Sequence, residues 1–151
     1  MKGDYYDVSF SLQKLLQVKE KERDEQQKHF EVSRKQFEEA GYRLYHLLRD
    51  REQMIVGVEG YATSGTTIAA LQTAQMASER MEKEILHVQG LANDARAKMN
   101  VQKDALHHAT IELKKLEKLK VKQHETYRQE EKLFEQQQLD ETATLLYIRQ
   151  S

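Results

Sequence analysis

The stretch that decides the fold is FEVSRKQFEEAGYRLYHLLRDREQM, which runs from Phe30 to Met54. Its residues form two interleaved sets with a spacing of seven: Phe30, Phe37 and Leu44 in one, and Ser33, Ala40, Leu47 and Met54 in the other. Apolar positions that alternate by three and four residues keep one narrow stripe on one face of a helix. Because a helix cannot bury such a stripe by itself, the pattern predicts a partner helix that lies nearly parallel to it.

The composition indicates a long helical protein. The 151-residue chain has no proline, cysteine or tryptophan, and 32% of its residues are charged. The absence of proline removes the strongest helix breaker, and Glu, Gln, Lys, Arg, Leu and Ala favour helices. Hydrophobic residues, at 38%, are too few for a thick globular core but sufficient for helix seams. We therefore predict an all-α fold in a single domain spanning residues 1–151.

The charge and the N-terminal sequence restrict the class of protein. A formal net charge of -1 argues against a protein that coats nucleic acid or an anionic membrane along its whole length. The absence of cysteine excludes disulfides and is compatible with a reducing cytosol. The N-terminus, MKGDYYDVSF, lacks the apolar segment of a signal peptide, and no window reaches the length of a membrane span. We expect a soluble, cytoplasmic protein.

The periodicity predicts two helices joined by one turn. The expected elements are a frayed N-terminus of eight or nine residues, a helix over about 10–56, a turn over about 57–66 and a helix over about 67–148. The turn contains GVEGYATSGTT, in which glycines and hydroxyl residues cluster. The heptads of the second helix pass through Gly90 without a shift of register, which favours one continuous helix over a break there that would give three.

Folding the chain about residue 61 predicts how the two helices pair as an antiparallel coiled coil. In this register Phe37 faces Ile85, Phe30 faces Ala92 and Leu16 faces Leu106. If Phe37 is fully buried, replacing it by Ala costs roughly 3–5 kcal/mol. The second helix is the longer one, so residues beyond about Leu113 are expected to overhang the first helix. An isolated helix with exposed apolar residues is marginal, so something should cover these residues: self-association, a bound partner or folding back of the helix.

No catalytic, cofactor or metal site is expected. The turn glycines lack the Lys and Ser/Thr that follow in a phosphate-binding loop. No serine lies near an obvious base, and no two histidines have the spacing of a helical zinc site. The sequence predicts a protein that is not an enzyme and has no small-molecule substrate.

One charge run stands out: KKLEKLKVK, from Lys114 to Lys122, has five lysines and one glutamate. A solvated helix face is the simplest interpretation, and docking onto an acidic protein surface or contact with nucleic acid are the alternatives. Nucleic-acid binders interleave arginines and aromatic residues with such runs, and the run contains neither. Nucleic acid is therefore not expected as a partner.

Five segments, taken in order, resemble the FliJ family of the flagellar type III export apparatus. They are FSLQKLLQVKE from Phe10, AGYRLYHLL from Ala40, the glycine-bearing turn, RMEKEI from Arg80 and LDETA from Leu139. Their order, their spacing and the total length carry the resemblance, which covers nearly the whole chain. It implies an antiparallel two-helix coiled coil similar to the central stalk of rotary ATPases. It also implies a non-enzymatic role in flagellum assembly, in the cytoplasm and peripherally at the inner face of the cell membrane.

The resemblance further implies three partners: the hexameric flagellar export ATPase, a membrane protein of the export gate, and export chaperones. The ATPase side is expected near the two termini, at Leu12, Leu16, Tyr127 and Phe134. The gate side is expected near the turn, at Leu47, Met54 and Met81. Of the positions that match the gate surface of the family, these differ from it in residue type: Arg43, Asp50, Met54, Ala77, Glu84 and Val88.

The heptad pattern alone, without the family resemblance, is also compatible with a second class of function. A structural coiled coil of another assembly, such as a rotor stalk or a filament-associated scaffold, has the same heptads. A tight dimer that buries the overhang favours the scaffold, whereas a monomer favours the ATPase partner.

Overall fold

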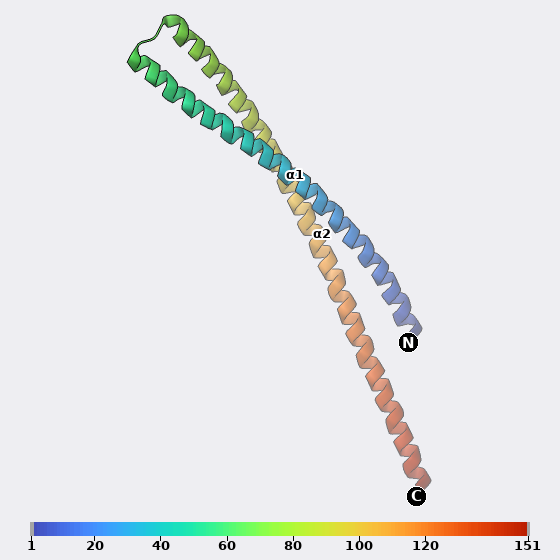
Figure 1. The fold of residues 1–151 in the computed structure, drawn as a ribbon. Helices are drawn as coiled ribbons and strands as arrows, with labels where there is room; N and C mark the ends of the chain where they lie inside the picture. The colour runs from blue at the N-terminus through green and yellow to red at the C-terminus, as the bar shows by residue number, and fades with distance from the viewer. Residues whose placement is uncertain (1, 151) are drawn as a thin grey trace. The chain divides into compact units, whose positions relative to one another are not determined.

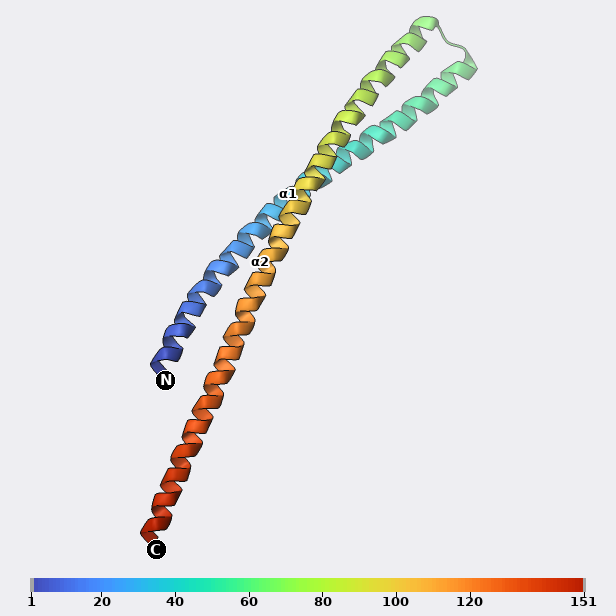
Figure 2. The same ribbon diagram turned by 180° about the vertical axis from the view of Figure 1, so that it is seen from behind.

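The computed structural model describes residues 2–150, which form two long helices (Figure 1). Helix α1 spans Lys2–Ser64 and helix α2 spans Ile68–Gln150. Within this described range there is no strand, and the predicted all-α fold is confirmed. The helices run in opposite directions on either side of one short connection, as a second view also shows (Figure 2). The predicted hairpin of two long helices is therefore confirmed, and α2 continues through Gly90 without a break.

The connection is shorter than the turn that the sequence predicts over residues 57–66. Helix α1 continues through Gly57 and Gly60, so only residues 65–67 are non-helical. The chain reverses at Gly65, whose φ of 84° lies in the left-handed region that glycine adopts without strain. Thr67 then caps α2, because its Oγ1 accepts a hydrogen bond of 3.1 Å from the N–H of Ala70.

Residues 2–9 are helical, whereas the sequence predicts that the first eight or nine residues fray; Met1 lies outside the described residues. Tyr5 accounts for the difference, because its ring stacks on that of Tyr127 with the centroids 3.9 Å apart. The Tyr5 hydroxyl oxygen also lies 3.1 Å from Nδ1 of His124. These contacts extend the pairing of the helices beyond Leu113, which is only 2% exposed. The uncovered part of α2 therefore begins near Glu131 and not at Leu113.

The register of the two helices also differs from the predicted one. Gln13 contacts Lys120, Arg43 pairs with Glu84, and Arg51 pairs with Glu82. Folding about residue 61 would instead have placed Arg43 opposite Glu79, so the predicted pairing of Phe37 with Ile85 is wrong. The cause is the extra length of α1, which moves the reversal of the chain from residue 61 to Gly65.

The contacts divide the chain into two compact units, and each has its own buried seam. The first unit combines the N-terminal part of α1 up to Asp24 with α2 from His107 onward, and it buries Leu12, Leu16 and Leu113. The second unit, Glu25–Leu106, buries Ser33, Ile85, Val88 and Ala92. Ser33 is satisfied within α1, because its hydroxyl donates a hydrogen bond of 2.8 Å to the carbonyl oxygen of His29.

Phe37 is half-buried and not fully buried. Because the hydrophobic loss scales with the apolar area removed from water, Phe37→Ala should lower the free energy of unfolding by about 1–2 kcal/mol, less than for a fully buried phenylalanine. Urea unfolding followed by circular dichroism measures this loss. A loss of about 3 kcal/mol or more would show that Phe37 is buried more deeply in solution than in the structure.

Candidate functional site

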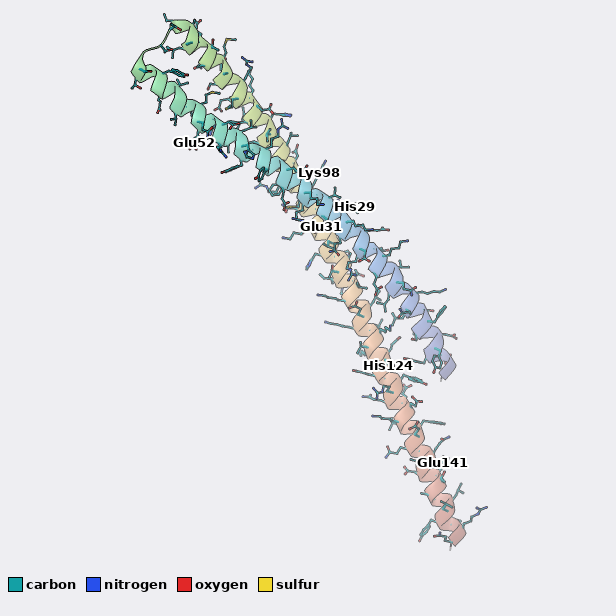
Figure 3. All side chains as sticks on the ribbon, viewed as in Figure 1. His29, Glu31, Glu52, Lys98, His124 and Glu141 are labelled. Carbon is teal, nitrogen blue, oxygen red and sulfur yellow. The ribbon has the colours of Figure 1, made fainter. Side chains whose placement is uncertain are left out.

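The C-terminal end of α2 is an uncovered helical segment. We call residues 132–150 the overhang, because every one of their side chains is exposed. Figure 3 shows this segment around Glu141, beyond the part of α2 that lies beside α1. Its large apolar residues include Leu133, Phe134, Leu139, Leu145, Leu146 and Tyr147, each more than half exposed. A helical segment with this many exposed large apolar side chains indicates a site of interaction.

The four residues predicted for the ATPase side have different environments. Leu12 and Leu16 are 8% and 4% exposed, so they build the seam of the first unit. Tyr127 is half-buried beneath Tyr5. Only Phe134, at 55% exposed, offers a free side chain to a partner. The structure therefore places these residues in one unit but gives most of them a packing role.

A cluster of tyrosines lies just before the overhang, and the sequence reasoning missed its N-terminal members. Tyr6 lies 5.6 Å from Tyr5, measured between ring centroids, and Tyr5 stacks on Tyr127. Burial raises the pKa of the Tyr127 hydroxyl, and the nearby carboxylate of Glu131 raises it further. The sequence carries no local signal for this cluster, because Tyr127 is distant in the chain from Tyr5 and Tyr6.

The lysine run forms a solvated face, as its simplest interpretation predicts. Lys114, Lys115, Lys118 and Lys122 are exposed, and none of them forms an ion pair with another residue in the described range. Lys120 is different, because its Nζ donates a hydrogen bond of 2.6 Å to Oε1 of Gln13 on α1. This lysine therefore contributes to pairing of the helices.

The residues predicted for the gate side all belong to the second unit. Leu47 and Met81 are half-buried, and Met54 lines a hollow of about 520 Å³ between the helices. Two of the positions whose residue types depart from the family pattern, Arg43 and Glu84, form an ion pair with each other. The two residues that differ from the family pattern therefore carry opposite charges, and their ion pair links α1 to α2.

Residues 9–151 match the sequence model of the family described as Flagellar FliJ protein. The chain belongs to the FliJ family. It is 28% identical over 141 residues to the Flagellar FliJ protein of Bacillus subtilis (strain 168), an alignment that covers 93% of this chain and 96% of the relative. No solved structure matches the chain. The resemblance inferred from the ordered motifs is confirmed.

Membership of the FliJ family makes the chain a component of flagellar protein export. The match to the family includes the overhang, the seam residues Leu12 and Leu16, and the connection. It begins at Ser9, so Tyr5 and Tyr6 precede it. The stacking of Tyr5 on Tyr127 is thus made by a residue outside the part of this FliJ-family chain that matches.

Residues 2–150 of this FliJ-family chain contain neither a metal-binding cluster nor a membrane-spanning helix. Across that range, no three or more His, Asp or Glu side chains are grouped so that they could hold a metal ion. Neither helix contains, in its described residues, a stretch apolar and long enough to cross a membrane.

Proposed function

We propose that this FliJ-family chain is a non-enzymatic factor that binds the hexameric flagellar export ATPase through the overhang. The single observation that supports this binding mode is the complete exposure of residues 132–150, a helical segment rich in large apolar side chains. The segment is about 28 Å long at 1.5 Å per residue, and a helix with side chains is about 10–12 Å wide. It is therefore a slender projection that fits a narrow opening.

The distribution of apolar residues around the overhang favours a partner that encloses it. Consecutive residues of a helix point about 100° apart. Leu133 and Phe134 therefore face different directions, and so do Leu145, Leu146 and Tyr147, yet all five are exposed. A flat surface or a single partner helix would cover only one of these directions. The central channel of a ring surrounds the helix and covers all of them, which is why a hexameric ATPase suits this segment.

Two further partners belong to the proposed function: the export gate and the export chaperones. Leu47, Met54 and Met81 lie near the connection, and we assign to them the contact with the membrane protein of the export gate. Their partial exposure leaves apolar surface available for this contact. Export chaperones are proposed from the family alone, without assigned residues. These partners would hold the protein in the cytoplasm, at the inner face of the cell membrane.

Replacing Phe134 by alanine tests the ATPase contact. Because Phe134 is a large exposed aromatic side chain that the ring would bury, Phe134→Ala should weaken binding to the purified ATPase about tenfold or more. The measurement is surface-immobilised binding with the full-length chain. Tyr42→Ala is the matched control, since Tyr42 is also an exposed aromatic side chain but lies in the second unit. The affinity of this variant for the ATPase should equal that of the unsubstituted protein. Equal affinities for both variants would contradict the assignment.

Self-association through the overhang is the competing function, because a second copy would cover part of its exposed apolar surface. Sedimentation of the full-length chain distinguishes the two. A monomer supports the ATPase factor, whereas a tight dimer that Phe134→Ala dissociates supports a structural scaffold.

A further inference from the structure

The end of the second unit that carries the connection is almost free of charge. We call residues 53–78 the tip: they comprise the last turns of α1, the connection and the first turns of α2. Glu59 is the only charged side chain among them, although 32% of the whole chain is charged. The surface of a coiled coil owes its solubility to charged side chains, so a tip without them needs a physical explanation.

Apolar side chains lie on several sides of the tip. Met54, Val58, Tyr61 and Leu71 line the hollow of about 520 Å³ between the helices. Val56 and Ile68 do not line it, and their side chains are 67% and 76% exposed. Ile55 and Met76, which also lie outside the hollow, are 49% and 60% exposed. Both the inner and the outer surfaces of the tip are therefore apolar.

Four hydroxyl groups of the tip form hydrogen bonds within the chain. Thr63 and Ser64 each donate a bond of 3.0 Å to the carbonyl oxygen of Gly60, and Thr73 donates one of 3.0 Å to that of Ala69. Thr67 accepts its bond from Ala70, as described above. A hydroxyl that is already bonded loses much less when it leaves water than a free one does. Transfer of the tip into a poorly hydrated environment is correspondingly easier.

Charges return on both helices immediately next to the tip, and they balance. The residues that form this collar are Arg49, Asp50, Arg51 and Glu52 on α1, and Glu79, Arg80, Glu82 and Lys83 on α2. Arg51 and Glu82 form an ion pair of 3.3 Å between the helices. A collar with four bases and four acids does not select a surface of one sign, so apolar contact and not net charge would govern binding at this place.

We propose that the tip inserts into the surface of a phospholipid bilayer. A partner helix seated in the hollow would cover the inner surface only and would leave Ile68 in water. A lipid surface receives all sides of the end of a hairpin at once, so it covers Ile68 as well. This inference concerns the second unit and does not depend on binding of the ATPase by the overhang.

The position of Glu59 limits the depth of insertion. Glu59 precedes the end of α1 by five residues, or about 7–8 Å along the helix axis. Interfacial protein segments enter a bilayer by about 5–10 Å. At this depth the carboxylate remains among the head groups, while Tyr61, the connection and Ile68 lie below it. The balanced collar then stays in water.

A single tryptophan tests the proposal directly, because the chain has none of its own. Full-length Tyr61→Trp is mixed with vesicles of phosphatidylcholine and, separately, of phosphatidylcholine with phosphatidylglycerol. Insertion predicts a blue shift of the emission with both vesicles, little dependence on salt, and quenching by lipids brominated on their acyl chains. No blue shift with either vesicle would overturn the proposal. A shift that appears only with the anionic vesicles and vanishes in salt would also overturn it, because apolar insertion does not require lipid of one charge.

Two substitutions in the Tyr61→Trp background locate the contact. Ile68→Glu should reduce partitioning about tenfold or more, because it places a charge where the tip meets the acyl chains. Glutamate is favourable in the first turn of a helix, so α2 should remain folded. Leu86→Glu is the matched control: Leu86 is 67% exposed in the same unit but lies outside the tip, and partitioning should not change. Equal loss with both substitutions, or a tip variant that only dissociates a dimer in sedimentation, would overturn the proposal.

Discussion

Removal of residues 132–150 should abolish binding to the export ATPase and leave the paired part of the hairpin as stable as before. Every side chain in this range is exposed, so its removal exposes little or no buried apolar surface. The last side chains of α2 that α1 covers, around Tyr127 and Glu131, remain in the shortened chain. The expected result is a loss of binding without a loss of fold.

Two measurements are needed for this truncation. A pull-down with the purified ATPase measures binding, and thermal unfolding by circular dichroism measures the stability of the shortened chain. Undiminished binding would sink the proposal that the overhang is the contact. A large drop in the unfolding temperature would show instead that the overhang folds onto the hairpin in solution. The full-length Tyr42→Ala protein, whose exposed substitution lies outside the overhang, serves as the positive control for binding.

Ile85→Ala should destabilise the second unit by about 2–4 kcal/mol, the range for a buried isoleucine whose cavity closes incompletely. Ile85 is 2% exposed and is one of the few buried residues of its unit, along with Val88 and Ala92. A seam only one or two side chains thick has no second layer that can move in to fill the space, so the loss should not be small.

Leu86→Ala is the control for Ile85→Ala, since Leu86 is the next residue in the chain but is 67% exposed. Its substitution should change the free energy of unfolding by less than about 0.5 kcal/mol. Urea unfolding followed at 222 nm compares the two proteins. Similar values for the two substitutions would show that the face of α2 that packs on α1 is assigned wrongly.

The fold follows from the sequence because heptads are local signals that repeat. The spacing of Phe30, Phe37 and Leu44 and the absence of proline predict paired helices, which the structure confirms. The exact register depends on a single event, the point where the chain reverses. Gly57 and Gly60 look like turn residues, yet α1 accommodates both, since one glycine costs a helix only about 1 kcal/mol. Helix propensity alone does not show that the chain reverses at Gly65 and not at Gly57 or Gly60.

The candidate site was predicted only in outline. The sequence predicts an uncovered C-terminal helix with Phe134 as a contact residue, and Phe134 is exposed in the structure. The sequence does not show that Leu12 and Leu16 are buried between the helices, because leucine is equally common in a helix seam and on a partner-binding surface. The contact of Tyr5 with Tyr127 joins residues far apart in the chain, and no local pattern predicts it. Without this contact, the sequence predicts that the uncovered part of α2 begins at about Leu113, whereas in the structure it begins near Glu131.

The short connection also sets an order of folding. Contacts between the helices close loops of very different length: Arg51 and Glu82 are 31 residues apart, whereas Tyr5 and His124 are 119 apart. Since each doubling of a loop adds about 0.6 kcal/mol of closure entropy, the longer loop costs about 1 kcal/mol more if it closes independently. Pairing should therefore start beside the connection and advance residue by residue toward the N-terminus of α1. The stacking of Tyr5 on Tyr127 should therefore form last during folding and be lost first during unfolding.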